Sequence, residues 1–231
     1  MNYNIWHGFH SEAKPFEFQK ERQKSAQEAV KKEDPDILVL TEACFGHENK
    51  YGLNVDYKTV FNFPYYLHAP SEPNQYEWGS AILSKYPLTG KNLSEDWLSY
   101  LKSQINVNGT PISLDVFHPY PNITNQQKIE FLNKNLKEIR KNYILAGDFN
   151  SISPEEYDKE KLLRGFKTFI KEPEKAVAGL LQGQTIPHVV SKGLIDTYKQ
   201  KNKKFNYTIP TDARSKNKDS AMRLDYIFCS P

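Results

Sequence analysis

The sequence predicts an α/β fold in which strands and helices alternate along the chain. Short apolar runs rich in β-forming residues recur from one end to the other, and helical patterns separate several of them. No repeat, linker or low-complexity stretch divides the 231 residues. This length is enough to bury one sizeable core. We therefore expect a single domain, residues 1–231, that mixes sheet and helix.

Eight apolar runs are the candidate strands. Their residues are mostly aliphatic, β-branched or aromatic, which favours pleated and partly buried chain. The expected strands are Met1–Trp6, Ile37–Leu40, Tyr65–Leu67, Ser80–Ser84, Ile105–Val107, Ile112–Phe117, Tyr143–Ala146 and Leu224–Cys229.

Three segments carry helical patterns. We expect helices over Glu21–Lys32, Asn122–Lys141 and Pro154–Gln182. The first ends at Asp34-Pro35, which is a stop signal, and the second begins behind Thr124, a suitable N-cap. The third is broken near Pro173, because proline lacks the backbone N–H that a helix interior needs.

Composition indicates a globular chain, with 38% apolar and 26% charged residues. The net charge of +3, from 31 basic and 28 acidic residues, is too balanced to indicate a nucleic-acid partner by itself. Basic residues do gather between Lys199 and Arg223. This cluster is either a solvated loop or a rim that attracts phosphate groups.

Only Cys44 and Cys229 are cysteines, which excludes a disulfide framework and a zinc-binding spacing. The two thiols favour a reducing compartment, and we expect the cytoplasm. No apolar run approaches membrane-spanning length, and the N-terminus carries no basic-then-apolar signal segment. We therefore expect a soluble protein.

The tetrapeptide Gly147-Asp148-Phe149-Asn150 follows the apolar run Tyr143–Ala146, at the end of a predicted strand. Side chains two residues apart on extended chain point to the same side, so Asp148 and Asn150 are expected to act together. A carboxylate can hold a water or a metal ion, and a carboxamide can donate to a phosphoryl oxygen. The pair suits hydrolysis of a phosphate ester, although Asp and Asn are also common turn formers.

Asn4 and Glu42 are polar residues in or beside predicted strands. Asn4 lies inside the first strand, where its amide is either satisfied locally or functional. Glu42 comes two residues after Ile37–Leu40. An acid there is either a solvated turn residue or a hard oxygen ligand for Mg²⁺.

His118 and Asp225 complete the set of candidate residues. His118 follows Ile112–Phe117 in a proline-flanked loop, where it is either a proton shuttle or an ordinary turn residue. The remaining histidines, which have no comparable setting, are His7, His10, His47, His68 and His188. Asp225 lies within an apolar strand, and because an unpaired buried carboxylate is costly, we expect a histidine or arginine partner.

The order of these residues along the chain forms a recognisable pattern. The order is Asn4, Glu42, His118, Asp148, Asn150 and Asp225, joined by the strings GDFN (147–150), GSAILSKYPL (79–88) and RLDYIF (223–228). This pattern closely resembles the endonuclease/exonuclease/phosphatase superfamily, which includes DNase I, abasic-site endonucleases, neutral sphingomyelinases and inositol polyphosphate 5-phosphatases. The resemblance spans residues 1–231.

The resemblance implies a fold and a reaction. The fold is a four-layer sandwich of two mixed β-sheets flanked by helices. The reaction is divalent-metal-dependent hydrolysis of phosphate esters by an activated water, as in a phosphodiesterase, nuclease or phosphatase. Glu42 would bind Mg²⁺ or Mn²⁺, with Asn4 beside it. By the same resemblance, Asp148 would position and deprotonate the water, Asn150 would orient the phosphate, and His118 would stabilise the phosphorane or protonate the leaving oxygen.

One family feature is missing from the sequence. Family chains end with a Ser-Asp-His strand whose histidine is held by the Asp225 equivalent, and no histidine follows Asp225 here. Met1 also falls within the first strand rather than before it. We therefore expect a domain truncated at both ends, without the C-terminal strand, and poorly active in this form. The alternative is a catalytically incompetent fragment or binding module of the same fold.

The expected partner is a phosphate-ester substrate, with nucleic acid among the candidates, and the expected state is a monomer. His118 occupies a position that is tyrosine in many abasic-site endonucleases, which disfavours dedicated abasic-site repair. DNA, RNA, lipid phosphates and sugar phosphates are not distinguished by the sequence.

Overall fold

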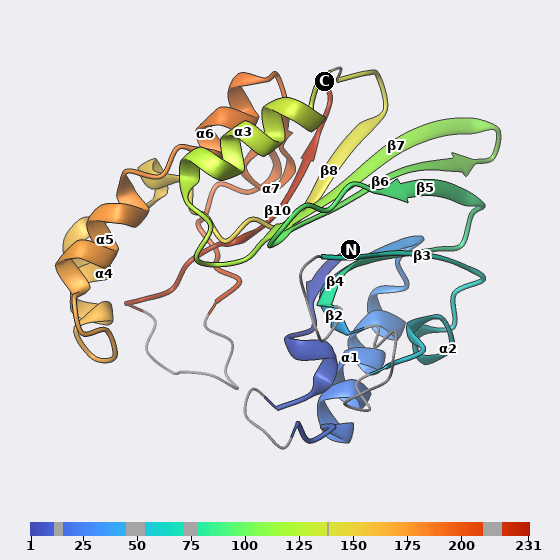
Figure 1. Cartoon of the computed structure of the whole chain (residues 1–231), viewed down its shortest axis with the longest axis horizontal. Coiled ribbons are helices and arrows are strands. Elements are labelled where there is room, and N and C mark those ends of the chain that lie inside the picture. Colours follow the sequence, from blue (N-terminus) through green and yellow to red (C-terminus); the bar gives the residue numbers. More distant parts are fainter. Residues whose placement is uncertain (12–15, 45–53, 72–77, 138, 210–218) are drawn as a thin grey trace.

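The structure is a computed structural model that describes residues 1–11, 16–44, 54–71, 78–137, 139–209 and 219–231. Two β-sheets lie face to face, and helices cover the outer side of each (Figure 1). The predicted four-layer sandwich is confirmed.

The first sheet has four strands in the order β1-β2-β4-β3. They are β1 (Asn2–Asn4), β2 (Ile37–Cys44), β4 (Trp78–Ser84) and β3 (Tyr65–Pro70). β1 runs parallel to β2, and the other pairs are antiparallel. The outer face is covered by the 3-10 helix η1 (His7–Phe9), α1 (Lys20–Glu33) and α2 (Tyr57–Phe61). Ala26, Val30 and Phe61 pack there against Leu38 and Leu40 of β2.

The second sheet has six strands in the order β5-β6-β7-β8-β10-β9. They are β5 (Leu88–Asn92), β6 (Leu98–Val107), β7 (Thr110–Pro119), β8 (Tyr143–Asp148), β10 (Asp225–Cys229) and β9 (Ile195–Asp196). α3 (Asn125–Asn135) and α6 (Thr185–Ser191) pack on its outer face through Phe131, Leu132, Ile186 and Val189. The short helix α7 (Thr197–Lys201) follows β9 directly.

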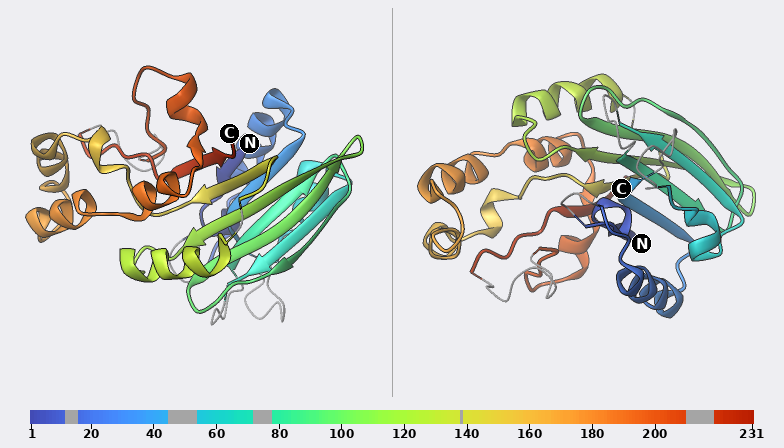
Figure 2. Two further views of the ribbon diagram at one scale, coloured as in Figure 1. Left: turned by 90° about the horizontal axis from the view of Figure 1, so that it is seen from above. Right: turned by 60° about the horizontal axis from the view of Figure 1, so that its bottom comes forward.

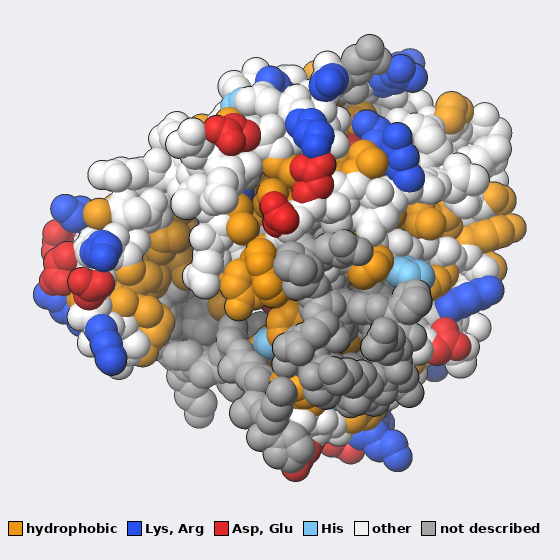
Figure 3. Space-filling view, in the orientation of Figure 1, with side chains coloured by type: hydrophobic (Ala, Val, Ile, Leu, Met, Phe, Trp, Pro, Cys, Tyr) orange, Lys and Arg blue, Asp and Glu red, His pale blue; other side chains and the backbone are white. Residues whose placement is uncertain are grey.

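A helical extension lies beyond the end of the sheets (Figure 2). It consists of the 3-10 helix η2 (Pro154–Glu156), α4 (Lys159–Phe166) and α5 (Pro173–Leu181), with its own small apolar core around Leu162 and Val177. Charged side chains of both signs cover this end (Figure 3), and some form pairs such as Lys167 with Glu174. The face of the extension that Figure 3 shows therefore carries both charge signs.

The predicted helices are largely found. α1 stops at Asp34, which adopts the left-handed conformation, and α3 begins at Thr124 with a capping box to Gln127. α5 begins at Pro173, the predicted break. α3 ends at Asn135 and not at Lys141, so the last predicted turns of that helix are wrong.

The apolar core between the sheets determines where the polar candidate residues lie. Val39, Leu101 and Ile82 pack in this apolar layer. On three strands the next inward-facing position beyond the layer is polar. These neighbours are Val116 and His118 on β7, Ala146 and Asp148 on β8, and Ile227 and Asp225 on β10. The alternation of strand side chains thus gathers the polar groups at one end of the space between the sheets.

Candidate active site

Glu42 reaches this end of the sandwich through a bulge in β2. The pairing of β2 with β4 shifts between Leu40 and Ala43, and Glu42 has a φ of 54°. A bulge of this kind re-aims a side chain that regular alternation would send to the other face. The carboxylate accepts hydrogen bonds from Asn4 Nδ2 at 2.9 Å and from the His7 backbone N–H at 3.2 Å. The sequence prediction placed Glu42 beyond the strand, but β2 continues to Cys44.

Asn4 connects carboxylates that belong to different sheets. Its Nδ2 donates to Glu42 Oε1 and to Asp148 Oδ2, both at 2.9 Å. Its Oδ1 accepts from the Trp6 backbone N–H at 2.8 Å, which fixes the orientation of the amide. The amide is therefore both satisfied locally and part of the candidate site.

Asp148 is the last residue of β8 and is buried. Its Oδ1 accepts from the Asn150 backbone N–H at 2.8 Å, so both of its carboxylate oxygens are held. Asn150 has a φ of 43°, and its Nδ2 donates to the carbonyl of Pro119 at 2.9 Å. Asn150 thus lies beyond β8 in a left-handed conformation, so the extended geometry from which a common direction of Asp148 and Asn150 was predicted ends before it.

Gly147 allows β8 to approach β7 closely. Its φ is 142°, and a Cβ at this position would lie 2.1 Å from the carbonyl oxygen of Phe117. Any larger residue would push apart the two strands that carry His118 and Asp148.

His118 lies within β7 and not in a loop after it, so that part of the prediction is wrong. The strand continues to Pro119, and His118 is opposite Ser99 of β6. A ligand atom of His118 lies within 4.8 Å of one from Glu42 and one from Asp148. Its Nε2 is buried and has no hydrogen-bond partner within the described part of the chain. This nitrogen is therefore available to a bound group.

Asp225 is the residue opposite Asp148 in the β8–β10 pair. Its Oδ1 accepts from Asn2 Nδ2 at 3.3 Å. Burial, followed by the charges of Asp148 and Glu42, raises the pKa of the Asp225 carboxyl well above its usual range. The expected histidine or arginine partner is not found among the described residues.

The nearby arginine is engaged elsewhere. Arg223 is buried and pairs with Asp196 at 2.6 Å and with Glu156 at 2.8 Å. Lys199, at the other end of the predicted basic cluster, pairs with Glu155 at 2.6 Å. These two residues are not a free phosphate-attracting rim. Further members of the cluster, Asp212, Arg214, Lys216 and Lys218, lie outside the described residues.

Lys128 is a site-supporting residue that the sequence prediction missed. It lies on α3 and is buried, and its ammonium donates to the carbonyls of Phe149 at 3.2 Å and Asn150 at 2.6 Å and to the Ser151 hydroxyl at 3.0 Å. Burial lowers the pKa of Lys128 to about 8. A lysine at a buried position of the helical pattern is the only sequence signal that could have identified it.

His7 also lies at the site, although the sequence offered no reason to select it. Besides its backbone bond to Glu42, its Nε2 is 3.9 Å from Glu42 Oε2. Its ring packs edge-on against Trp78, with 4.1 Å between the ring centroids. His7 therefore helps to fix the Glu42 carboxylate from the first-sheet side.

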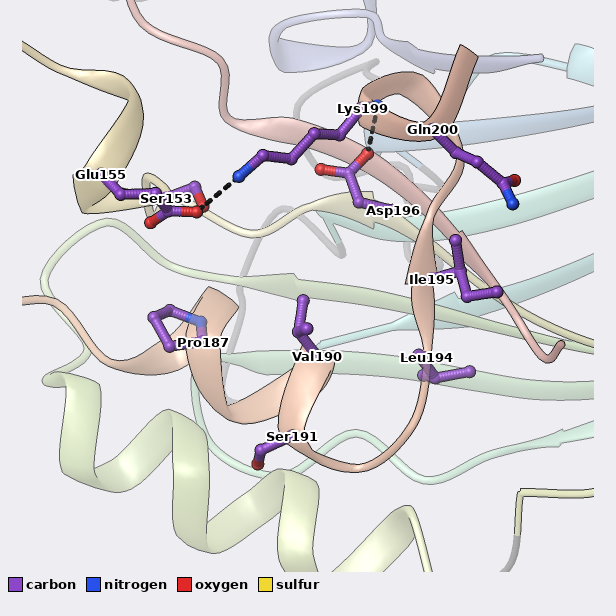
Figure 4. Close-up of a pocket in the computed structure, with 10 residues that line it drawn as sticks. All are labelled: Ser153, Glu155, Pro187, Val190, Ser191, Leu194, Ile195, Asp196, Lys199 and Gln200. Carbon is purple, nitrogen blue, oxygen red and sulfur yellow. Dashed lines mark hydrogen bonds and ion pairs between the residues drawn. The ribbon is translucent and has the colours of Figure 1, made fainter.

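Two cavities adjoin this region. One, of about 220 Å³, is lined by Asn4, Glu42, Asp148, Thr208 and Asp225 among others. The other, of about 700 Å³, lies between α6, α7 and η2, where Lys199 extends to Glu155 above Pro187 and Val190 (Figure 4). It contains none of the predicted site residues.

The donor set fits a divalent cation. Carboxylate oxygens of Glu42 and Asp148 converge with a ring nitrogen of His118. The Nε2 of this ring is buried and has no protein partner among the described residues. Hard oxygen donors of this kind suit Mg²⁺ and Mn²⁺, and a nearby imidazole is compatible with Mn²⁺. The chain therefore carries a possible metal-binding group at the predicted place.

The fold, two mixed β-sheets flanked by helices, is DNase I-like. The model of the endonuclease/exonuclease/phosphatase family matches residues 1–231, and the chain belongs to this family. Family membership supports hydrolysis of phosphate esters. No match is found among curated protein sequences.

Solved structures show the same fold at low sequence identity. A family protein from Bacteroides thetaiotaomicron is 19% identical with a TM-score of 0.61, over 100% of this chain and 82% of that one. The catalytic domain of human Nocturnin with bound sulfate is 15% identical with a TM-score of 0.59, over 99% and 79%. Humanized TDP2 of D. rerio is 17% identical with a TM-score of 0.56, over 99% and 82%.

Among the described residues, no helix is long and apolar enough to cross a membrane.

Proposed function

We propose that this chain is a divalent-metal-dependent phosphoesterase that cleaves phosphodiesters with an activated water. The observation that carries the proposal is the convergence of Glu42, His118 and Asp148 from separate strands to within 4.8 Å. Burying such groups together is unfavourable unless they bind a common ligand or one another. Phosphate oxygens and a cation would satisfy them.

In this proposal Asp148 acts as the base toward the attacking water. Its oxygens are held by Asn4 and by the Asn150 backbone, so the carboxylate is fixed before substrate arrives. The water oxygen forms a bond to phosphorus, its proton passes to Asp148, and the bond from phosphorus to the leaving oxygen breaks. His118 Nε2 would donate to a phosphoryl oxygen in the transition state or protonate the leaving oxygen. Asn150 would orient the phosphate, with its amide released from Pro119.

The proposed cation is Mg²⁺, with Mn²⁺ as a substitute. Glu42 would hold it, and Asn4 would keep the Glu42 carboxylate in place. When bound, the cation would supply Lewis-acid neutralisation of charge on the phosphoryl oxygens.

Neighbouring structures support a phosphodiester substrate. One is the complex of D. rerio TDP2 with a single-strand DNA product, 17% identical with a TM-score of 0.50. Another is the endonuclease domain of the telomere-specific retrotransposon TRAS1, 13% identical with a TM-score of 0.54. We propose a nucleic-acid or nucleotide phosphodiester for this chain as well. Two free cysteines, Cys44 and Cys229, support a reducing, cytoplasmic location, and we propose a monomer.

A second candidate is a binding module of the same fold with little activity. The observation that favours it is Asp225, whose described side-chain partners are the neutral groups of Asn2 and Thr208 rather than a cation. Burial and the charges of Asp148 and Glu42 raise the pKa of this carboxyl, which disfavours the charged form that would best hold an imidazolium.

Turnover of a labelled oligonucleotide by residues 1–231 with Mg²⁺ tests both candidates. The phosphoesterase proposal is supported if the chain cleaves the oligonucleotide, if a chelator stops the cleavage, and if Asp148→Ala abolishes it. The binding module is supported if the oligonucleotide is bound but not cleaved by the unaltered chain. Lys134→Met, at an exposed position of α3, is the control for non-specific effects of substitution.

A further inference from the structure

An exposed aromatic pair, Trp97 and Tyr120, adjoins the candidate site. Their side chains are 41% and 39% exposed, and their ring centroids are 5.3 Å apart with an interplanar angle of 46°. The rings are tilted and not stacked face to face, so each keeps much of its π-face uncovered. Exposed aromatic surface beside a phosphate-handling site needs an explanation.

The register of β6 and β7 places this pair next to His118. Leu98 is opposite Pro119, and Ser99 is opposite His118. The ladder continues by one more bond, from the Tyr120 backbone N–H to the carbonyl of Trp97 at 2.8 Å. Tyr120 is thus two residues, roughly 7 Å of extended chain, beyond His118.

The same register also shows which residues share a face of the second sheet. Ser99 and His118 are an opposed pair, so their side chains lie on one face of the sheet, and Trp97 and Tyr120 follow in the turn before β6 and directly after β7. That face points toward the other sheet, because the Ser99 hydroxyl donates to Ser80 of β4 at 2.9 Å. The aromatic pair therefore lies at the ends of β6 and β7 that adjoin Ser99 and His118.

We propose that Trp97 and Tyr120 form a stacking subsite for a nucleobase attached to the phosphate that is cleaved. The inference rests on the proposed function and names the residues that would bind the base of a nucleotidic substrate. Aromatic rings bind every base through its π-face, so the subsite confers preference for a base without sequence specificity. Asp96, directly before Trp97, disfavours a phosphate group at the same place.

The Pro119 carbonyl connects this subsite to the catalytic loop. Pro119 lies between His118 and Tyr120, and its carbonyl accepts from Asn150 Nδ2. A base held on Tyr120 would thus lie next to Pro119, whose carbonyl holds the Asn150 amide that is proposed to orient the phosphate.

The test compares two single-stranded oligonucleotides that differ only by an abasic tetrahydrofuran residue in place of one thymidine next to the cleaved bond. Trp97→Ala and Tyr120→Ala should each lower kcat/KM for the thymidine substrate about tenfold, the size of one lost base–aromatic stack. Turnover of the abasic substrate should change less than twofold. Trp97→Phe should keep most of the preference. Phe169→Ala, which removes an aromatic ring that is 61% exposed outside the site, is the matched control.

Binding in the presence of chelator separates this inference from the proposed function. Fluorescence anisotropy should show that the unaltered chain binds the thymidine oligonucleotide more tightly than the abasic one, and that Trp97→Ala removes the difference. Base-dependent binding without cleavage would overturn the proposed function and leave the subsite standing. Cleavage of both substrates at equal rates by every variant would overturn the subsite, as would a larger effect of Trp97→Ala on a phosphodiester lipid.

Discussion

Single residues hold the candidate site in place chiefly through hydrogen bonds to carboxylates and carbonyls. Asn4 fixes Glu42 and Asp148 together, and the Lys128 ammonium fixes the backbone that follows Asp148. Neither role can be read from the sequence alone. Asn4 is a candidate in the sequence because it is a polar residue inside an apolar strand, and the family resemblance places it beside the metal. Lys128 is not a candidate there, because a lysine on a helix is usually solvated.

Replacement of Lys128 tests its part as a positioning residue. Lys128→Met keeps the apolar stem but leaves two carbonyls and a hydroxyl without their donor, so we expect kcat to fall by on the order of tenfold to a hundredfold with little change in KM. Lys128→Arg should restore most of kcat, since a guanidinium can also donate to several carbonyls. The control is Lys134→Met, which changes an exposed lysine of the same helix. An unchanged kcat for Lys128→Met would contradict the role.

Asp225 should make stability depend on pH. Its pKa is raised in the folded chain by burial and by Asp148 and Glu42, so the folded state holds a proton that the unfolded state releases near the ordinary value of about 3.9. The stability that this group contributes is therefore lost as pH rises from that value through the raised pKa. Asp225→Asn should remove this loss. Urea unfolding in the presence of chelator should show that the free energy of unfolding of the variant rises relative to that of the unaltered chain between pH 4 and pH 8. A difference in free energy of unfolding that stays constant over this range would refute the argument.

At the scale of elements, the sequence predicts the presence of a strand better than it predicts where that strand ends. Runs such as 143–146 and 224–229 are strongly apolar and were found, whereas β5 (Leu88–Asn92) was missed because its residues are mostly polar and exposed. The bulge at Glu42 and the extension of β7 through His118 depend on pairing with distant strands. Such tertiary pairing overrides local pattern, so the prediction ended both strands too early.

The close approach of β7 and β8 gives a prediction at this scale. Gly147→Ala would place a Cβ 2.1 Å from the Phe117 carbonyl oxygen at a φ of 142°. We expect a loss of at least about 2 kcal/mol in the free energy of unfolding, from overpacking and backbone strain together. Gly179→Ala is the control, because a Cβ there meets nothing within 4 Å and lies in a helix. That variant should be stabilised by about 0.5–1 kcal/mol. Equal melting temperatures for the two variants would show that the contact is not restrictive.

At the scale of the whole molecule, the site exists only where the two sheets meet. Glu42 and Asn4 belong to the first sheet, and His118, Asp148 and Asp225 belong to the second. The family resemblance predicted this arrangement, since the apolar and polar periodicity of each strand does not reveal which sheet it joins.

Binding of a cation between the sheets should stabilise the folded chain as a whole. A ligand that binds only the folded state adds about 2.7 kcal/mol at a concentration one hundred times its Kd. We therefore expect Mg²⁺ to raise the melting temperature, and Glu42→Gln to reduce that rise strongly. Asp34→Asn, an exposed change outside the site, should leave the rise intact. A rise that Glu42→Gln leaves intact would place the cation elsewhere.

The hydrogen bond from Asn4 to Asp148 also has a consequence for the order of folding. It joins residues 144 positions apart and two separate sheets, so it forms only after long loops have closed and the sheets have docked. Each sheet can assemble its own strands from nearer contacts before that step. We therefore expect the carboxylates to be brought together when the sheets dock and the apolar layer between them forms, so that their mutual repulsion opposes this docking rather than the collapse of either sheet.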